Sequence, residues 1–373
     1  MLPDKDGLNG GGGVQDGHPA EDPSVTLFRE YLRLKTVHPE PDYDAALKFL
    51  ERMAEELALP MKKVEVCPGR VVAIISWIGS RPELKSVVLN SHTDVVPVYE
   101  EHWKHHPFAA VKDADGNIYA RGAQDMKSVT IQYSKQTAMR NTAFWPNLGQ
   151  INLGHRMKFV WIYLYISHFH MLFIMNSDLS VCPQRRVINS FLEFREKEKQ
   201  RLNTSECFTL GDVTTINMTM VKGGVAYNVV PAEMDVSFDL RIPPTVNLQE
   251  FEEKIKVWCR EAGEDVTYDF AQKHMDQNLT STDENDPWWQ AFSSTCKAMN
   301  MTLKKEIFPA ATDSRFIREV GLPAFGFSPM NLTPILLHDH NEYLNEQVFL
   351  LGIQVYERLI PALADVAPLS GEL

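Results

Sequence analysis

The chain has few cysteines, and none of them are arranged for pairing. Its five cysteines, in 373 residues, are odd in number, widely spaced and without a C-x-x-C pair. This usage argues against a disulfide framework and is typical of reduced thiols in a cytoplasmic protein. The N-terminus also has no basic stretch followed by an apolar run, so we expect no signal peptide, and residues 1–22 are predicted to be a disordered tail.

Positive charge is also scarce. The chain carries 37 Lys and Arg against 49 Asp and Glu, a formal net charge of −12. General nucleic-acid binding requires clustered basic residues that displace counterions, so no nucleic-acid partner is expected. The hydrophobic fraction of 44% is ordinary for a globular protein with a sizeable core.

Acidic residues are nearly absent from one long segment. Between Lys127 and Glu193 the only acid is Asp178, and residues 159–175 form an apolar run whose only basic groups are two histidines. The run is near the minimum length of a transmembrane helix. It could be a buried core segment, a membrane helix or a foreign insert. A membrane association is the least favoured of the three.

Apolar periodicity predicts an α/β layer at the start of the chain. Helices are expected over 25–37, with Ser24 as its cap, and over 43–59. Three strand-like runs of the type found in parallel sheets follow. They span 62–67, 70–78 and 85–91.

The middle of the chain reads as a smaller α+β unit, after which the α/β pattern resumes. The expected elements are a helix over 187–202, strands over 213–220 and 233–242, a helix over 248–263 and a strand over 265–272, then a helix over 287–299 and strands over 303–308 and 322–328. We therefore expect one domain interrupted by another. The predicted parts are a tail (1–22), a discontinuous catalytic domain (23–136 and 284–373), an anomalous apolar insert (137–186) and a lid or dimerisation domain (187–283).

Metal-binding residue types occur at the ends of three apolar runs. In "LNSHTDVVP" His92 and Asp94 lie on the same side of an extended backbone, so the aspartate can orient the histidine, although a solvated strand end would look the same. Asp125 follows in "YARGAQDMKS", and "LLHDHNEYL" holds His338, His340 and Glu342. Carboxylates and neutral imidazoles are ligands that zinc accepts in hydrolases.

With these motifs the chain resembles metallopeptidase family M20, in its branch of zinc-dependent aminoacylases and carboxypeptidase G2-like enzymes. The motifs "SHTDVVPVYEEHWKHHPF", "YARGAQDMKS", "GGVAYNVVPAEMDVSFDLR" and "PAATDSRFIREVGLPAFGFSPMNLTPILLHDHNE" carry the resemblance, which covers about 23–136 and 187–365. It implies a three-layer α/β/α zinc-peptidase-like catalytic domain interrupted by an α+β lid. It also implies an aminoacylase-type metallohydrolase that converts N-acyl-L-amino acids to a carboxylate and a free L-amino acid by metal-activated water.

The resemblance assigns roles to particular positions. His92 would bind one zinc, Asp94 would orient His92, Asp125 would bridge two Zn²⁺ ions, and His338 would bind the second. It also implies small-molecule N-acylated amino acids as partners, and a homodimer.

Three further residues match positions that contact substrate in the family. Asn228 lies in "AYNVVP" and Arg241 in "DLR", where a guanidinium suits a substrate carboxylate. Arg315, in "TDSRF", is a candidate of the same kind. Asn228 could instead only form a turn, and Arg241 could be a surface ion pair.

The chain departs from the family between about 137 and 186. The family's Glu-Glu pair, which supplies the general base and a ligand, its further acidic ligand and its lid histidine belong there. Asp178 and His155 lack the motifs to replace them. We expect one zinc or none to be retained, and central sheet strands and the first lid strand to be missing. The alternative function is therefore an inactive splice or gene-model variant, one able to pair with an intact subunit.

Overall fold

Helices and strands alternate along the described chain. The structure, a computed structural model, describes residues 21–141, 160–162, 171–176, 181–229, 231, 233–310 and 312–369. The α-helices are α1 (Pro23–Leu32), α2 (Tyr43–Glu56), α3 (Lys127–Asn141), α4 (Val181–Leu202), α5 (Leu248–Ala262), α6 (Pro287–Ala298), α7 (Ser314–Glu319) and α8 (Glu346–Ala364). The strands are β1 (Met61–Cys67), β2 (Arg70–Ile75), β3 (Val88–Asn90), β4 (Val111–Lys112), β5 (Asn117–Tyr119), β6 (Val160–Ile162), β7 (Met171–Asn176), β8 (Thr215–Gly223), β9 (Glu233–Arg241), β10 (Asp269–Phe270) and β11 (Tyr343–Asn345). The chain is of the α/β class, with mixed helices and sheets.

The first two helices begin where acidic caps satisfy their free N–H groups. The carboxylate of Asp22 accepts a hydrogen bond from the Ser24 amide at 2.7 Å, and Asp42 caps α2 in the same way through Ala45. The predicted cap Ser24 is therefore wrong by two positions, because Pro23 is already the first helical residue, a position that proline favours.

The N-terminal and C-terminal parts of the chain share one core. Stacked rings join α1 to α8, through Phe28 and Phe349, and α1 to α2, through Tyr31 and Phe49. The predicted strands 62–67 and 70–78 form an antiparallel hairpin rather than a parallel pair. The connection between them is too short for the crossover that parallel strands need, and Gly69 turns it with a φ of +74°.

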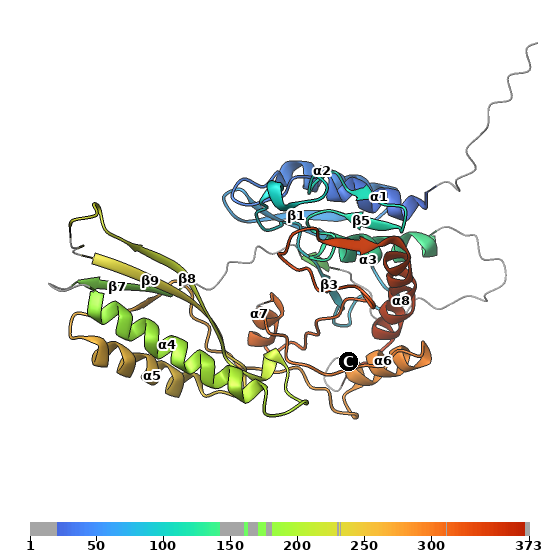
Figure 1. Cartoon of the computed structure of the whole chain (residues 1–373). Coiled ribbons are helices and arrows are strands. Elements are labelled where there is room, and N and C mark those ends of the chain that lie inside the picture. The colour runs from blue at the N-terminus through green and yellow to red at the C-terminus, as the bar shows by residue number, and fades with distance from the viewer. Residues whose placement is uncertain are drawn as a thin grey trace, which may run out of the picture.

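A second group of elements has its own core. Strands in the order β10-β7-β9-β8 form a sheet, and α4 and α5 lie along one face of it (Figure 1). Phe191 of α4 stacks on Phe238 of β9, with ring centroids 4.3 Å apart. The helix predicted over 187–202 begins earlier, at Val181.

The described parts of the apolar run 159–175 belong to two different sheets. Val160–Ile162 pairs in parallel with β3, and Met171–Asn176 pairs with both β9 and β10. The expectation that strands at these positions are missing is therefore wrong, because the β-branched and aromatic residues of the run supply them. Among the helices of the described ranges, none is long and apolar enough to cross a membrane.

Two predicted strands, 303–308 and 322–328, are not assigned as strands in the described structure. Some of their apolar side chains pack instead on helices. Leu303 and Phe325 contact the cluster of Trp289 and Phe292 on α6, which also contains Leu359 of α8. Helix packing therefore takes the place of strand pairing in this part of the fold.

Candidate metal centre

His92 lies just after β3, and the two residues beside it are anchored on one side of the chain by helices α1 and α3. Ser91 is buried and its hydroxyl contacts that of Thr130 on α3, at 3.0 Å. Thr93 is buried and contacts the Tyr31 hydroxyl of α1 at 2.9 Å. Because side chains alternate along an extended chain, His92 and Asp94 share the other side, as predicted.

Asp125 lies in the turn before α3, and this turn is folded around Glu342. The Glu342 carboxylate is fully buried and accepts hydrogen bonds from the amides of Gly122, Gln124 and Asp125, at 3.1, 2.6 and 3.3 Å. It also pairs with Arg121 at 2.8 Å. Glu342 therefore shapes the Asp125 turn from inside the protein.

Gly122 is required in this turn. Its φ is +88°, and a Cβ there would lie 2.8 Å from Cγ1 of Val95. A side chain would therefore push the turn away from the segment that carries His92.

Three of the predicted residues come together around one carboxylate. His92 Nε2 lies 2.9 Å from Asp125 Oδ1, and His338 Nε2 lies 3.2 Å from Asp125 Oδ2. The residues are separated by 33 and 213 positions in the chain. The two imidazoles thus face opposite oxygens of Asp125, as they would around a bridging carboxylate.

The tautomer of His92 follows from its second nitrogen. Nδ1 lies 2.9 Å from the main-chain carbonyl of Asp94 and 3.5 Å from its Oδ1. Both oxygens are acceptors, so Nδ1 carries the hydrogen. Asp94 therefore orients His92 with its main-chain carbonyl as well as with its side chain. In the neutral ring, the lone pair of Nε2 then points at Asp125 Oδ1, which is also an acceptor. Two acceptors this close need a proton or a cation between them.

The pKa shifts of His92 and Asp125 agree with this geometry. Burial lowers the pKa of His92, but the hydrogen bonds and charges of Asp125 and Asp94 outweigh it and hold that pKa well above its usual value. Burial raises the pKa of Asp125, but His338 and His92 outweigh it and hold that pKa below its usual range. A divalent cation would replace the proton that the site otherwise binds.

The donor types around Asp125 are ones that divalent metal ions accept. Imidazole and carboxylate suit zinc, and each oxygen of Asp125 faces one histidine. No group of three or more His, Cys, Asp or Glu residues that could hold a metal ion occurs within the described part of the chain. Among the described residues, each oxygen of Asp125 is therefore accompanied by one imidazole nitrogen as a possible metal donor.

Two other residues of the motif "LLHDHNEYL", His340 and Glu342, make different contacts. The ring of His340 packs against that of His102, with centroids 4.9 Å apart. Glu342 supports the Asp125 turn and faces Arg121 instead of the two histidines.

The three substrate-binding candidates lie in different places. Asn228 is in an exposed turn beyond β8. Arg241 ends β9, where it pairs with Asp239 at 2.9 Å and donates to the carbonyl of Pro309 at 3.3 Å. Arg315 is half-buried on α7. Among the contacts described, none joins one of these three side chains to the Asp125 carboxylate.

Sequence reasoning missed two contacts behind the site. His38 Nε2 lies 3.2 Å from Asp94 Oδ2, and Asn90 donates to the buried carboxylate of Asp313 at 3.1 Å. His38 has no pattern around it that marks a role. Asp313 stands in the "TDSRF" motif, so that motif could have drawn attention to it.

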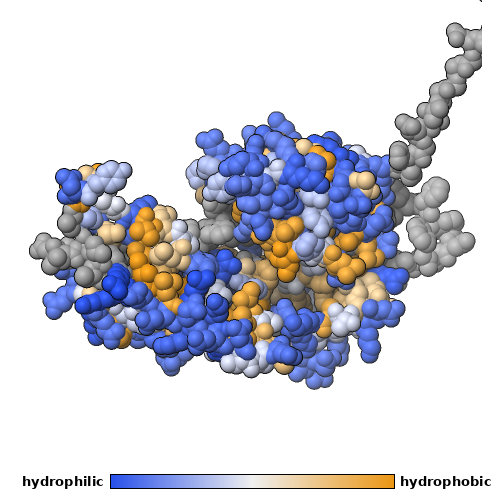
Figure 2. All heavy atoms as spheres, viewed as in Figure 1, coloured by the Kyte–Doolittle hydropathy of each residue, from blue (hydrophilic) through white to orange (hydrophobic). Residues whose placement is uncertain are grey.

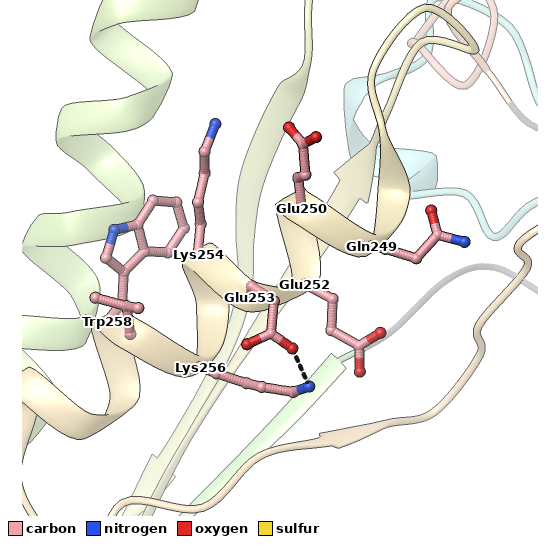
Figure 3. A pocket seen from close by; sticks show the side chains of 8 residues that line it. Gln249, Glu250, Glu252, Glu253, Lys254, Lys256 and Trp258 are labelled. Carbon is pink, nitrogen blue, oxygen red and sulfur yellow. Dashed lines mark hydrogen bonds and ion pairs between the residues drawn. The ribbon is translucent and has the colours of Figure 1, made fainter.

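A hollow on the surface of α5 is separate from the candidate metal ligands. Charged and amphipathic side chains line it, including Glu250, Glu253, Lys254, Lys256 and Trp258 (Figure 3). Glu253 and Lys256 form an ion pair across one turn of the helix. It contains none of the candidate metal ligands.

Comparisons of the chain with a family profile and with individual proteins point to the same family. The profile of "Peptidase family M20/M25/M40" matches residues 88–153 and 177–362, so it leaves out 154–176 and with them the whole apolar run 159–175. The chain is 47% identical to Aminoacylase-1B of Rattus norvegicus over 403 residues, covering 95% of this chain and 99% of that protein. It is 46% identical to Aminoacylase-1 of Homo sapiens over 408 residues, with the same coverage. Since these alignments are longer than the chain itself, the relatives contain residues that this chain lacks.

Solved structures show the same fold at low sequence identity. An M20 family metallo-carboxypeptidase from Sulfolobus solfataricus matches with a TM-score of 0.67 and 15% identity, covering 93% of this chain and 100% of that one. A dinuclear metal-binding M20 peptidase of Bacillus subtilis matches with a TM-score of 0.61 and 12% identity, covering 92% and 99%. From its profile match and its relatives, the chain belongs to peptidase family M20/M25/M40, as a hydrolase of the aminoacylase-1 type.

Proposed function

We propose that the chain hydrolyses N-acyl-L-amino acids to a carboxylate and a free L-amino acid at the centre formed by His92, Asp125 and His338. One observation carries the proposal: two imidazole nitrogens, from segments far apart in sequence, face opposite oxygens of one carboxylate. The likeness to aminoacylases supports the substrate class.

The residues present have distinct tasks in this proposal. Zinc ions held by His92 and Asp125, and by Asp125 and His338, would supply Lewis acidity toward the acyl carbonyl and toward water. Asp94 keeps the hydrogen of His92 on Nδ1, so that Nε2 remains a donor to metal. Glu342 holds the turn that presents Asp125.

Substrate recognition is proposed for three further side chains. Arg241 and Arg315 would each offer a two-pronged hydrogen-bond donor to the substrate carboxylate, and Asn228 would contact substrate from its exposed turn. For Arg241 this requires exchange of its ion pair with Asp239.

The alternative is an inactive member of the family. It is favoured by the small donor set, since each His–Asp pair has no third His, Cys, Asp or Glu donor among the described residues. Loss of a general base alone typically lowers the rate by about 10²–10⁴-fold.

Turnover of N-acetyl-L-methionine tests the proposal. The zinc-loaded chain should release free methionine, the chelated chain should not, and added zinc should restore the activity. The matched control is Asp339→Asn, which removes an exposed carboxylate from the loop that carries His338. A folded, zinc-binding chain without turnover would contradict the catalytic proposal and support the inactive alternative.

We further propose that the chain forms a homodimer through the sheet of β7–β10. β8 is an edge strand of that sheet, and Met218, Met220 and Val221 on it leave apolar side chains exposed. Figure 2 shows hydrophobic residues gathered over this group of elements. Such an edge is a ready template for a second copy. Sedimentation of the wild type and of Val221→Lys should give a dimer and a monomer, respectively.

The domain boundaries are part of the same proposal. Residues 187–283 would form the lid, and 23–136 with 284–373 the catalytic domain, on either side of the insert 137–186. Separate hydrophobic clusters support this division, since one of them contains only residues between Val187 and Phe270. A cytoplasmic location is also proposed, in keeping with the free thiols of Cys67, Cys207, Cys259 and Cys296.

A further inference from the structure

The Asp94 carboxylate lies between two imidazoles. Its Oδ1 is 3.5 Å from Nδ1 of His92, and its Oδ2 is 3.2 Å from Nε2 of His38. Only 13% of the Asp94 side chain is exposed, so solvent offers few other partners for these oxygens. The two contacts therefore fix how the carboxylate is rotated about its own axis.

His38 is held in place by the backbone as well as by this contact. Its amide donates to the carbonyl of Val95 at 3.2 Å, and the amide of Val95 donates to the carbonyl of Thr36 at 2.9 Å. Val37 and Val95 thus form a parallel bridge between the segment after α1 and the segment that carries His92. The position of the His38 ring is consequently set by the same pairing that positions Asp94.

From this geometry we propose that His38 is a positioning residue for the metal centre, and the inference rests on the proposed function of that centre. His38 donates from Nε2 to Asp94 Oδ2 and so turns Oδ1 toward Nδ1 of His92. His92 then keeps its hydrogen on Nδ1 and presents Nε2 to the metal. Removal of a direct outer partner of a metal ligand, the place that Asp94 has here, typically costs about 10–100-fold in metal affinity, so the loss of His38 should cost an amount near the lower end of this range.

Two substitutions separate this role from a general effect on folding. His38→Leu removes the donor, whereas His38→Gln keeps an N–H group of similar reach. His106→Leu is the matched control, because it removes an exposed histidine that pairs with Glu100 at 3.6 Å and has no contact with Asp94 among those described.

The experiment is a chelator competition that measures the affinity of the full-length chain for Zn²⁺, with thermal unfolding recorded in parallel. We expect His38→Leu to bind Zn²⁺ about tenfold more weakly than the wild type, the lower end of the range for a direct outer partner. We expect His38→Gln and His106→Leu to bind within about threefold of the wild type. Unchanged affinity in His38→Leu would overturn the inference while leaving the proposed function intact. An equal loss in His38→Gln and His38→Leu would also overturn it, because the donor would then not be what matters. A wild-type chain that binds no Zn²⁺ would contradict the proposed function itself, and the inference with it.

Discussion

Nε2 of His338 lies 3.2 Å from Oδ2 of Asp125, although 213 residues separate the two in the chain. His338 has a φ of +65° and a half-exposed side chain, so neither local regularity nor burial explains its position. The contact places the loop before β11 against the turn before α3. The opposite oxygen of Asp125 remains directed at His92.

Asp125→Asn should abolish the bridge. An amide has one oxygen and a hydrogen-bond donor, so it cannot accept two cations. We expect zinc content after dialysis to fall toward zero and turnover of an N-acetylated amino acid to fall by more than about 100-fold. Metal analysis by mass spectrometry measures the first effect. Wild-type zinc content in this variant would show that Asp125 is not a ligand, and Asp339→Asn should retain both zinc and turnover.

Glu342→Gln should destabilise the fold strongly. It leaves Arg121 buried without its partner and weakens three main-chain hydrogen bonds of the Asp125 turn. Breaking a buried pair by removing one charge typically costs about 3–5 kcal/mol. Urea denaturation would measure this cost. The comparison is Glu346→Gln, which removes a more exposed pair with Lys112 and should cost less than about 1 kcal/mol. Equal losses in the two variants would contradict the role of Glu342.

The contact between Asn90 and Asp313 can be tested by exchanging the two side chains. Burial raises the pKa of Asp313, and Asn90 is the described hydrogen-bond donor to its carboxylate. Asn90→Asp should cost about 1–3 kcal/mol, because it places two carboxyl groups together. The double variant Asn90→Asp with Asp313→Asn should recover most of that stability, since it restores one amide and one carboxylate. Additive effects in this double-mutant cycle would mean that the two side chains do not interact.

Lys127 should make the stability of the fold depend on pH. Burial lowers its pKa to about 7, although Asp94 and Glu342 act in the opposite direction. Between about pH 7 and pH 10 the unfolded chain binds a proton that the folded chain does not. The free energy of unfolding of the wild type should therefore rise with pH, relative to Lys127→Met, by up to about 1.4 kcal/mol per pH unit. Parallel stability curves for the two proteins across this range would contradict the expected titration.

The sequence predicted which residues lie together better than it predicted the sheets, and the metal-binding and substrate-binding roles of those residues stay predictions. The period-two spacing of His92 and Asp94 was sufficient to place them on one side of the chain, and the family motifs linked them to Asp125 and His338. By contrast, nothing local shows that residues 160–162 and 171–176 pair with different sheets, because an apolar run fits any buried strand. Long-range partners decide such pairing.

The same limit explains why the sequence did not reveal the contact of His38 and why it grouped Glu342 with the candidate metal ligands. His38 acts across 56 residues, and its contact depends on the parallel bridge between Val37 and Val95. Glu342 was grouped with His338 by sequence spacing, but the turn between them directs it to the main-chain amides around Asp125. Spacing identifies residue types that can bind metal, whereas the fold decides which of them support the site from behind.

The most direct test is the anomalous scattering of zinc in crystals of the full-length chain. We expect anomalous peaks between His92 Nε2 and Asp125 Oδ1 and between Asp125 Oδ2 and His338 Nε2. Zinc bound elsewhere, with these three side chains in direct contact and free of metal, would contradict this expectation.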